Sequence, residues 1–166
     1  TMITKYFTEL TDYIRSYSKR TRGEEVLVSG NFFNGSPVYY TIRDTVDVVT
    51  TEMEATLFRQ PYWYRYISGF AAGRDVVVAE NPYGGIVPEL VKELNRGRGY
   101  DLYRLFLLEA AACGCNMSIP YGGWMGNTMK DAFHPPKEVT CEVADYLKEH
   151  DACISRVSGA TVAVLY

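Results

Sequence analysis

A short apolar run that ends in a carboxylate and a turn constrains the fold of this chain more than any other feature. Residues 75–80 read Asp-Val-Val-Val-Ala-Glu, and Asn-Pro-Tyr-Gly-Gly follows at residues 81–85. A brief β-branched run without polar alternation is typical of a strand buried on both faces. Because Glu80 ends this predicted strand, it lies where parallel α/β sheets carry their chemical groups.

The rest of the chain repeats this arrangement. Further strands are predicted at residues 25–30, 46–52, 115–119 and 161–166. Helices are predicted at residues 3–18, 39–43, 61–72, 87–95, 101–112 and 136–150. This alternation predicts an α/β fold with parallel strands and helical crossovers. Since parallel strands share one direction, the polar or glycine-rich residues that follow them are expected at a single edge of the sheet.

Composition excludes several classes of protein. The chain has 166 residues, of which 47% are hydrophobic, enough for one compact domain with a core. A net charge of -3 does not indicate the basic surface that binds nucleic acid. No uninterrupted apolar run reaches the roughly eighteen residues that a membrane span needs, and no secretory signal begins the chain.

The cysteines and histidines do not have the spacing of metal ligands. Cys113 and Cys115 are one residue apart rather than two, and Cys141 and Cys153 are distant. We therefore expect buried free thiols, no metal, no cofactor and a reduced, cytoplasmic setting.

Three segments resemble a known family of enzymes. Residues 46–52, 76–85 and 116–126 look like the sixth, seventh and eighth strands of a TIM-barrel glycoside hydrolase, in the style of the family 42 β-galactosidases and related hypothetical glycosidases. The stretch Asn-Met-Ser-Ile-Pro-Tyr-Gly-Gly-Trp-Met-Gly at residues 116–126 is the most characteristic. The resemblance implies half of a (β/α)8 barrel over residues 1–160. Residues 161–166 are then the first strand of a truncated following domain, or an added edge strand.

The resemblance also implies roles for residues. Glu80 would be the nucleophile of a retaining glycoside hydrolase acting on β-linked sugars, and Trp124 or Tyr121 would form the floor of the sugar subsite. The general acid/base of such enzymes usually ends the fourth strand. That strand would precede Thr1, so activity of this chain as an enzyme stays open.

A second carboxylate is available at the same predicted edge. Retaining glycosidases need two carboxyl groups about 5–5.5 Å apart, and neighbouring strands lie roughly 4.8 Å apart. Glu52 ends the predicted strand next to that of Glu80 and is therefore a second catalytic candidate, with Glu54 competing for the role. The structural alternative for each carboxylate is a helix cap or a salt bridge.

The substrate-binding candidates are amide and aromatic residues near the strand exits. They are Asn31, Asn81, Tyr83, Asn116, Tyr121 and Trp124. Amides can hydrogen-bond sugar hydroxyls, and aromatic rings can stack on sugar rings. The alternative for each asparagine is a turn residue.

Half of a closed barrel leaves two strand edges unpaired, which predicts a homodimer or higher homo-oligomer. The first alternative function is a catalytically silent half-barrel that self-associates. The second is an open, doubly wound α/β domain that binds a small ligand. A chain that stops within an apolar strand is expected to be a fragment, and residues 1–4 resemble the leader of cloning vectors derived from β-galactosidase.

Overall fold

The computed structural model describes residues 1–52, 61–71, 75–79, 93–94, 96–118, 136–154 and 161–162. The helices in these ranges are α1 (Met2–Arg22), α2 (Pro61–Ala71), α4 (Tyr100–Ala112) and α5 (Lys137–Glu149). The strands are β1 (Ser29–Asn31), β2 (Val48–Glu52), β3 (Asp75–Ala79) and β4 (Asn116–Ser118). Single 3-10 turns are η1 (Pro37–Tyr39), η2 (Arg43–Thr45) and η4 (Asp151–Cys153).

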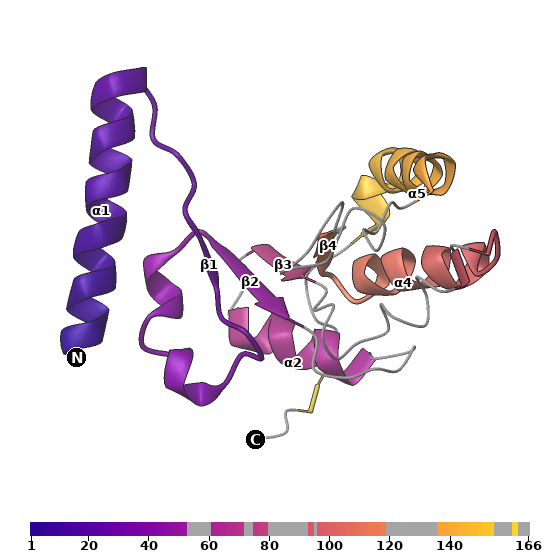
Figure 1. Ribbon diagram of the computed structural model, residues 1–166. Coiled ribbons are helices and arrows are strands. Elements are labelled where there is room, and N and C mark those ends of the chain that lie inside the picture. Colours follow the sequence, from indigo (N-terminus) through magenta and orange to yellow (C-terminus); the bar gives the residue numbers. More distant parts are fainter. Residues whose placement is uncertain are drawn as a thin grey trace.

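The four strands form one parallel sheet in chain order, β1-β2-β3-β4. Figure 1 shows the sheet at the centre, with α1 beyond β1 at one side and α4 and α5 beyond β4 at the other. The prediction of an α/β fold with parallel strands is thereby confirmed. In the chain, α2 lies between β2 and β3 and α4 between β3 and β4, whereas the 3-10 turns η1 and η2 connect β1 to β2.

Strand β2 shows why these segments become strands. It is β-branched at four of five positions, and its side chains alternate between buried and half-buried. Val49 and Thr51 are fully buried, whereas Val48, Thr50 and Glu52 on the other face are half-buried. This two-residue period assigns Glu52 to the face opposite Val49.

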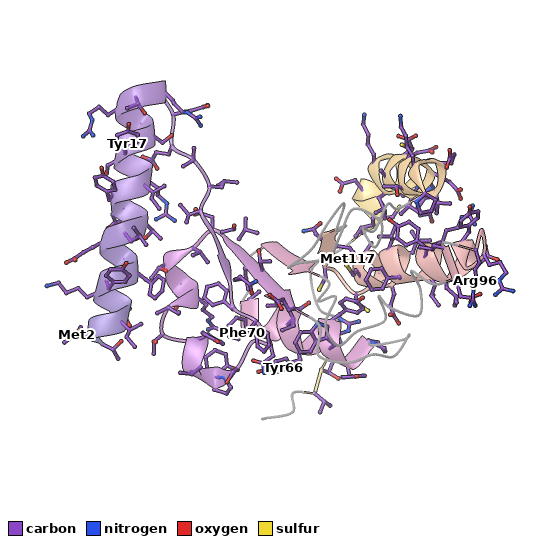
Figure 2. All side chains as sticks on the ribbon, in the orientation of Figure 1. Met2, Tyr17, Tyr66, Phe70, Arg96 and Met117 are labelled. Carbon is purple, nitrogen blue, oxygen red and sulfur yellow. The ribbon has the colours of Figure 1, made fainter. Side chains whose placement is uncertain are left out.

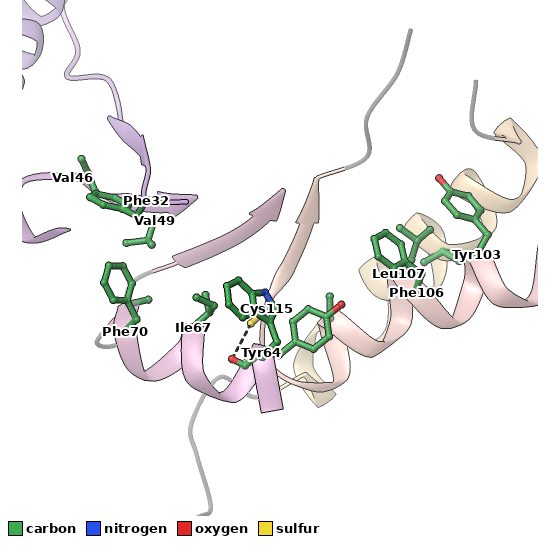
Figure 3. Packing of buried hydrophobic residues seen from close by; sticks show 14 of the residues in the cluster. Phe32, Val46, Val49, Tyr64, Ile67, Phe70, Tyr103, Phe106, Leu107 and Cys115 are labelled. Atoms are coloured by element: carbon green, nitrogen blue, oxygen red, sulfur yellow. Dashed lines mark hydrogen bonds between the residues drawn. The ribbon is translucent and has the colours of Figure 1, made fainter. Parts of the chain in front are cut away.

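Helix α2 supplies much of the core. Its buried residues are Trp63, Tyr64, Ile67, Phe70 and Ala71. Figure 3 shows Phe70 and Ile67 of α2 near Val49 of β2, and Tyr64 near Cys115 at the start of β4. Tyr62 of the same helix is exposed.

Helix α1 has well-formed ends. The Oγ1 of Thr1 accepts a hydrogen bond from the Thr4 amide at 3.1 Å, and Gly23 adopts φ 84° and donates its N–H to the Lys19 carbonyl. The left-handed conformation favours glycine there. The helix extends past residue 18 to Arg22 because its basic last turn complements the helix dipole.

Helices α4 and α5 pack against each other. The guanidinium of Arg104 donates to both carboxylate oxygens of Glu142, at 3.0 and 2.8 Å. These hydrogen bonds lower the pKa of Glu142 below its ordinary value. The hydroxyls of Tyr103 and Thr140 meet at 3.2 Å in the same interface.

Several predicted boundaries are corrected. The first strand is Ser29–Asn31 rather than 25–30, because the Val28 amide donates to the Asp47 side chain instead of to a neighbouring strand. The helix predicted at residues 39–43 is replaced by the single turns η1 and η2. Thr161 and Val162 lie in no strand, so the predicted strand at residues 161–166 is wrong at these two positions; residues 163–166 lie outside the described ranges.

The lengths of the helices and the exposure of the cysteines bear on two further predictions. None of the helices in the described ranges is long and apolar enough to cross a membrane. All four cysteines are free thiols, and Cys115 is buried as expected. The expectation of burial is wrong for Cys141 and Cys153, which are exposed, and Cys113 is half-buried.

Candidate functional site

Two sequence-predicted residues meet at the C-terminal edge of β1 and β2. The side-chain Nδ2 of Asn31 donates a hydrogen bond to Glu52 Oε1 at 2.7 Å. Each residue is the last of its strand, and the strands are parallel, so both exits lie at one edge. The sequence predicted this convergence.

The backbone holds Glu52 in place. Its amide donates to the Phe33 carbonyl at 2.6 Å, which continues the β1–β2 pairing past the end of β1. Its side chain is half-buried. Among the described residues, only Asn31 hydrogen-bonds the Glu52 carboxylate, which leaves Oε2 available to a ligand.

Asn31 has a structural role as well as a position at the edge. Its Oδ1 accepts the Phe33 amide at 2.8 Å, which is the hydrogen bond of an Asx turn. Its side chain therefore uses its acceptor to shape the loop and its donor to orient Glu52. The turn alternative is thus correct for the Oδ1 atom.

Phe33 is a site residue that the sequence reasoning missed. It has φ 50°, which an L-residue with a bulky side chain adopts only at a cost of about 1–2 kcal/mol, and its side chain is 48% exposed. A strained, exposed aromatic residue between Asn31 and Glu52 is more typical of a binding site than of a core. The signal in the sequence was the pair of phenylalanines in a turn of the form Asn-Phe-Phe-Asn-Gly.

Asn116 occupies a different part of the sheet. The register places Asn31, Thr50, Val77 and Asn116 in one row across the four strands. Asn116 nevertheless begins β4, and three strand spacings of roughly 4.8 Å separate it from Asn31. The described sheet therefore does not bring these two amides together.

The remaining predicted site residues are Glu80, Asn81, Tyr83, Tyr121 and Trp124, and they lie outside the described residues. The register pairs Glu52 with Ala79, the last residue of β3. The strand that precedes Glu80 is therefore the direct neighbour of the strand that ends in Glu52.

A hollow elsewhere does not have the chemistry of an active site. It has a volume of about 270 Å³ and lies between α4, β4 and α5, with Leu107, Val143 and Leu147 in its wall. Cys115 also lines it, but burial raises the pKa of this thiol, which disfavours the nucleophilic thiolate. In the described part of the chain, no cluster of histidine, cysteine or carboxylate side chains is suited to hold a metal ion.

Comparison of this chain with models of protein families, with curated proteins and with solved structures gave no match.

Proposed function

We propose that this chain is the C-terminal half of a retaining glycoside hydrolase barrel that acts on β-linked sugars, with Glu80 as its nucleophile. The observation that carries the proposal is the hydrogen-bonded pair of Asn31 and Glu52 at the C-terminal edge of a parallel sheet. In barrels of parallel strands, this edge is where catalytic residues lie.

Strand order favours a half-barrel over an open, doubly wound domain. A doubly wound sheet reverses its order at a switch point, and ligands bind there. The four described strands run in chain order without a reversal. Successive strands of a (β/α)8 barrel are neighbours in this same way.

The proposed chemistry assigns one task to each group. A Glu80 carboxylate oxygen attacks the anomeric carbon, and the bond from that carbon to the leaving oxygen breaks with its electron pair. Glu52 is the second carboxylate, oriented by Asn31. Phe33 offers an exposed ring for the sugar to stack on. Trp124 and Tyr121 are the aromatic residues that the resemblance assigns to the same subsite.

A substrate with a good leaving group tests the proposed nucleophile without the need for a general acid. A 2,4-dinitrophenyl β-galactoside releases dinitrophenolate without protonation, and azide can then take the sugar without a general base. We expect azide-dependent release of dinitrophenolate. Glu80→Gln should lower its rate on the order of 10³-fold or more, because the nucleophile is lost.

Matched variants separate catalysis from folding. Glu52→Gln keeps the shape of the side chain and should change this rate less than about threefold, because neither the release of dinitrophenolate nor the attack of azide needs an acid or a base. Glu149→Gln makes the same change at an exposed position of α5 and should leave the rate unchanged. Equal rates for the wild type, Glu80→Gln and Glu149→Gln would contradict the proposal and support the silent, self-associating half-barrel.

A further inference from the structure

Helix α1 exposes a continuous apolar stripe. Five of its side chains are between 40% and 64% exposed: Ile3, Tyr6, Leu10, Tyr13 and Tyr17. Their spacing alternates between three and four residues, which is the a/d pattern of a coiled-coil seam. Met2, which is 89% exposed, extends the stripe to the first turn. Figure 2 shows α1 apart from the sheet, with Met2 and Tyr17 at its two ends.

A different face attaches α1 to the rest of the chain. Thr11 and Ser18 are its buried residues, and the Ser18 hydroxyl donates to the Glu24 carbonyl at 2.9 Å. Arg15 donates to the Asp47 carboxylate at 2.9 Å, next to η2. The apolar stripe is therefore not needed to hold the helix in place, and no described part of the chain covers it.

We propose that the stripe pairs with the same stripe of a second copy of this chain, with the two α1 helices antiparallel. This proposal is independent of glycoside chemistry. It also differs from association through sheet edges, because the contact is made between helices.

The exposed area is sufficient for such a dimer. An aromatic side chain buries about 150–250 Å² when fully covered, so three half-exposed tyrosines and three aliphatic residues offer roughly 600–700 Å² per copy. Two copies then bury roughly 1,300 Å², which is within the range of specific protein interfaces. A monomer seldom leaves a patch of this size uncovered.

Charge decides the orientation. The last turn of α1 carries Lys19, Arg20 and Arg22, whereas the middle carries Glu9 and Asp12. Parallel pairing would bring two basic ends together and align the helix dipoles. Antiparallel pairing separates the basic ends by about 30 Å and sets the two helix dipoles in opposite directions.

The stripe also fixes a register. In antiparallel seams a positions face d positions, which sets Leu10 opposite Tyr13 of the partner subunit and Tyr17 opposite Tyr6 of the partner subunit. Beside Tyr17 lies a hollow of about 280 Å³, walled by Tyr13, Ile14 and Val26. In this register Tyr6 of the partner subunit would lie next to this hollow.

Sedimentation equilibrium of the full chain tests the proposal. The wild type should be a dimer at micromolar concentration. Tyr13→Lys inserts a charge into the seam and should raise the dimer dissociation constant at least tenfold. Thr8→Lys adds the same charge to the exposed opposite side of α1 and should change it less than twofold. Tyr13→Leu keeps the site apolar and should retain the dimer.

Circular dichroism of each variant shows whether α1 stays folded. A wild type that is monomeric at 100 µM would overturn the proposal, including the case in which it binds anionic lipid vesicles as a monomer. A dimer that Tyr13→Lys and Thr8→Lys weaken equally would also overturn it.

For the orientation, Cys141→Ser and Cys153→Ser first remove the exposed thiols. Met2→Cys with Thr21→Cys should then cross-link between copies, whereas efficient cross-linking of Thr21→Cys alone would contradict antiparallel pairing.

Discussion

Helices α1 and α2 carry similar apolar periodicity and have opposite surroundings. Helix α2 buries Trp63, Tyr64, Ile67, Phe70 and Ala71 against the sheet and α4. Helix α1 is almost twice as long and buries Thr11 and Ser18, while its three tyrosines are exposed. The period of a sequence thus shows that a helix has an apolar face, but not what covers that face.

The largest expected difference between the two helices lies in their aromatic residues. Phe70 is 2% exposed, and its ring contacts Phe32 and Tyr40. Phe70→Ala should lower the free energy of unfolding by about 3–5 kcal/mol because it leaves a cavity. Tyr13→Ala should change that of the monomer by less than about 0.5 kcal/mol. Urea denaturation at submicromolar concentration measures both free energies of unfolding. Similar losses for the two variants would contradict the difference between α1 and α2.

Two glycines show the same difference in surroundings at the level of the backbone. Gly35 and Gly23 both have positive φ, but a Cβ at Gly35 would lie 2.8 Å from Ile67 Cδ1, whereas at Gly23 it would meet nothing within 4 Å. Gly35→Ala should cost roughly 2–4 kcal/mol, since backbone strain and overpacking add. Gly23→Ala should cost about 1–2 kcal/mol, from strain alone. Thermal unfolding of the two variants gives the difference, and equal costs would show that α2 packs loosely around Gly35.

The attachment of α1 is expected to depend on Asp47. Its Oδ2 accepts both the Val28 amide and the Arg15 guanidinium, each at 2.9 Å. Asp47→Ala should cost about 1–3 kcal/mol because a half-buried amide and a cation lose their acceptor. Hydrogen exchange should become faster in α1 and stay unchanged in α2. Equal acceleration in both helices would mean that α1 belongs to the same cooperative unit as the core.

The smallest expected effect is the pH dependence of the α4–α5 contact. Arg104 lowers the pKa of Glu142, so this carboxylate stabilises the fold above its unfolded pKa of about 4.3 and loses that contribution as pH falls through the lower folded value. The Tm difference between wild type and Glu142→Gln should therefore shrink between pH 6 and pH 3. The exposure of the pair keeps the effect small. A difference that grows toward low pH would contradict this assignment.

Much of the secondary structure was readable from the sequence because its signals are local. The Pro61 start of α2, the Gly23 end of α1 and the β-branched run of β2 each depend on a few neighbouring residues. Parallel pairing of β2, β3 and β4 also followed, since parallel strands need a long crossover connection, which is usually a helix. The start of β1 did not follow, because residues 25–28 are as strand-like in sequence as those that pair.

The candidate site was readable in part. Glu52 and Asn31 were predicted at one edge because both end parallel strands, and the structure adds the hydrogen bond between them. The strain at Phe33 was not predictable, since its backbone conformation is imposed by the hydrogen bonds on either side of it rather than by its own preference. The predicted role of Glu80 as nucleophile remains a proposal.

Mass spectrometry of a trapped intermediate tests the proposed function most directly. The full chain is incubated with a 2,4-dinitrophenyl 2-deoxy-2-fluoro-β-galactoside, whose fluorine slows hydrolysis of the glycosyl-enzyme ester, and is then digested and sequenced. We predict one added fluorosugar per chain, bound to Glu80 and absent from Glu80→Gln. An unmodified chain at saturating reagent, or a sugar bound to a carboxylate elsewhere, would contradict the account.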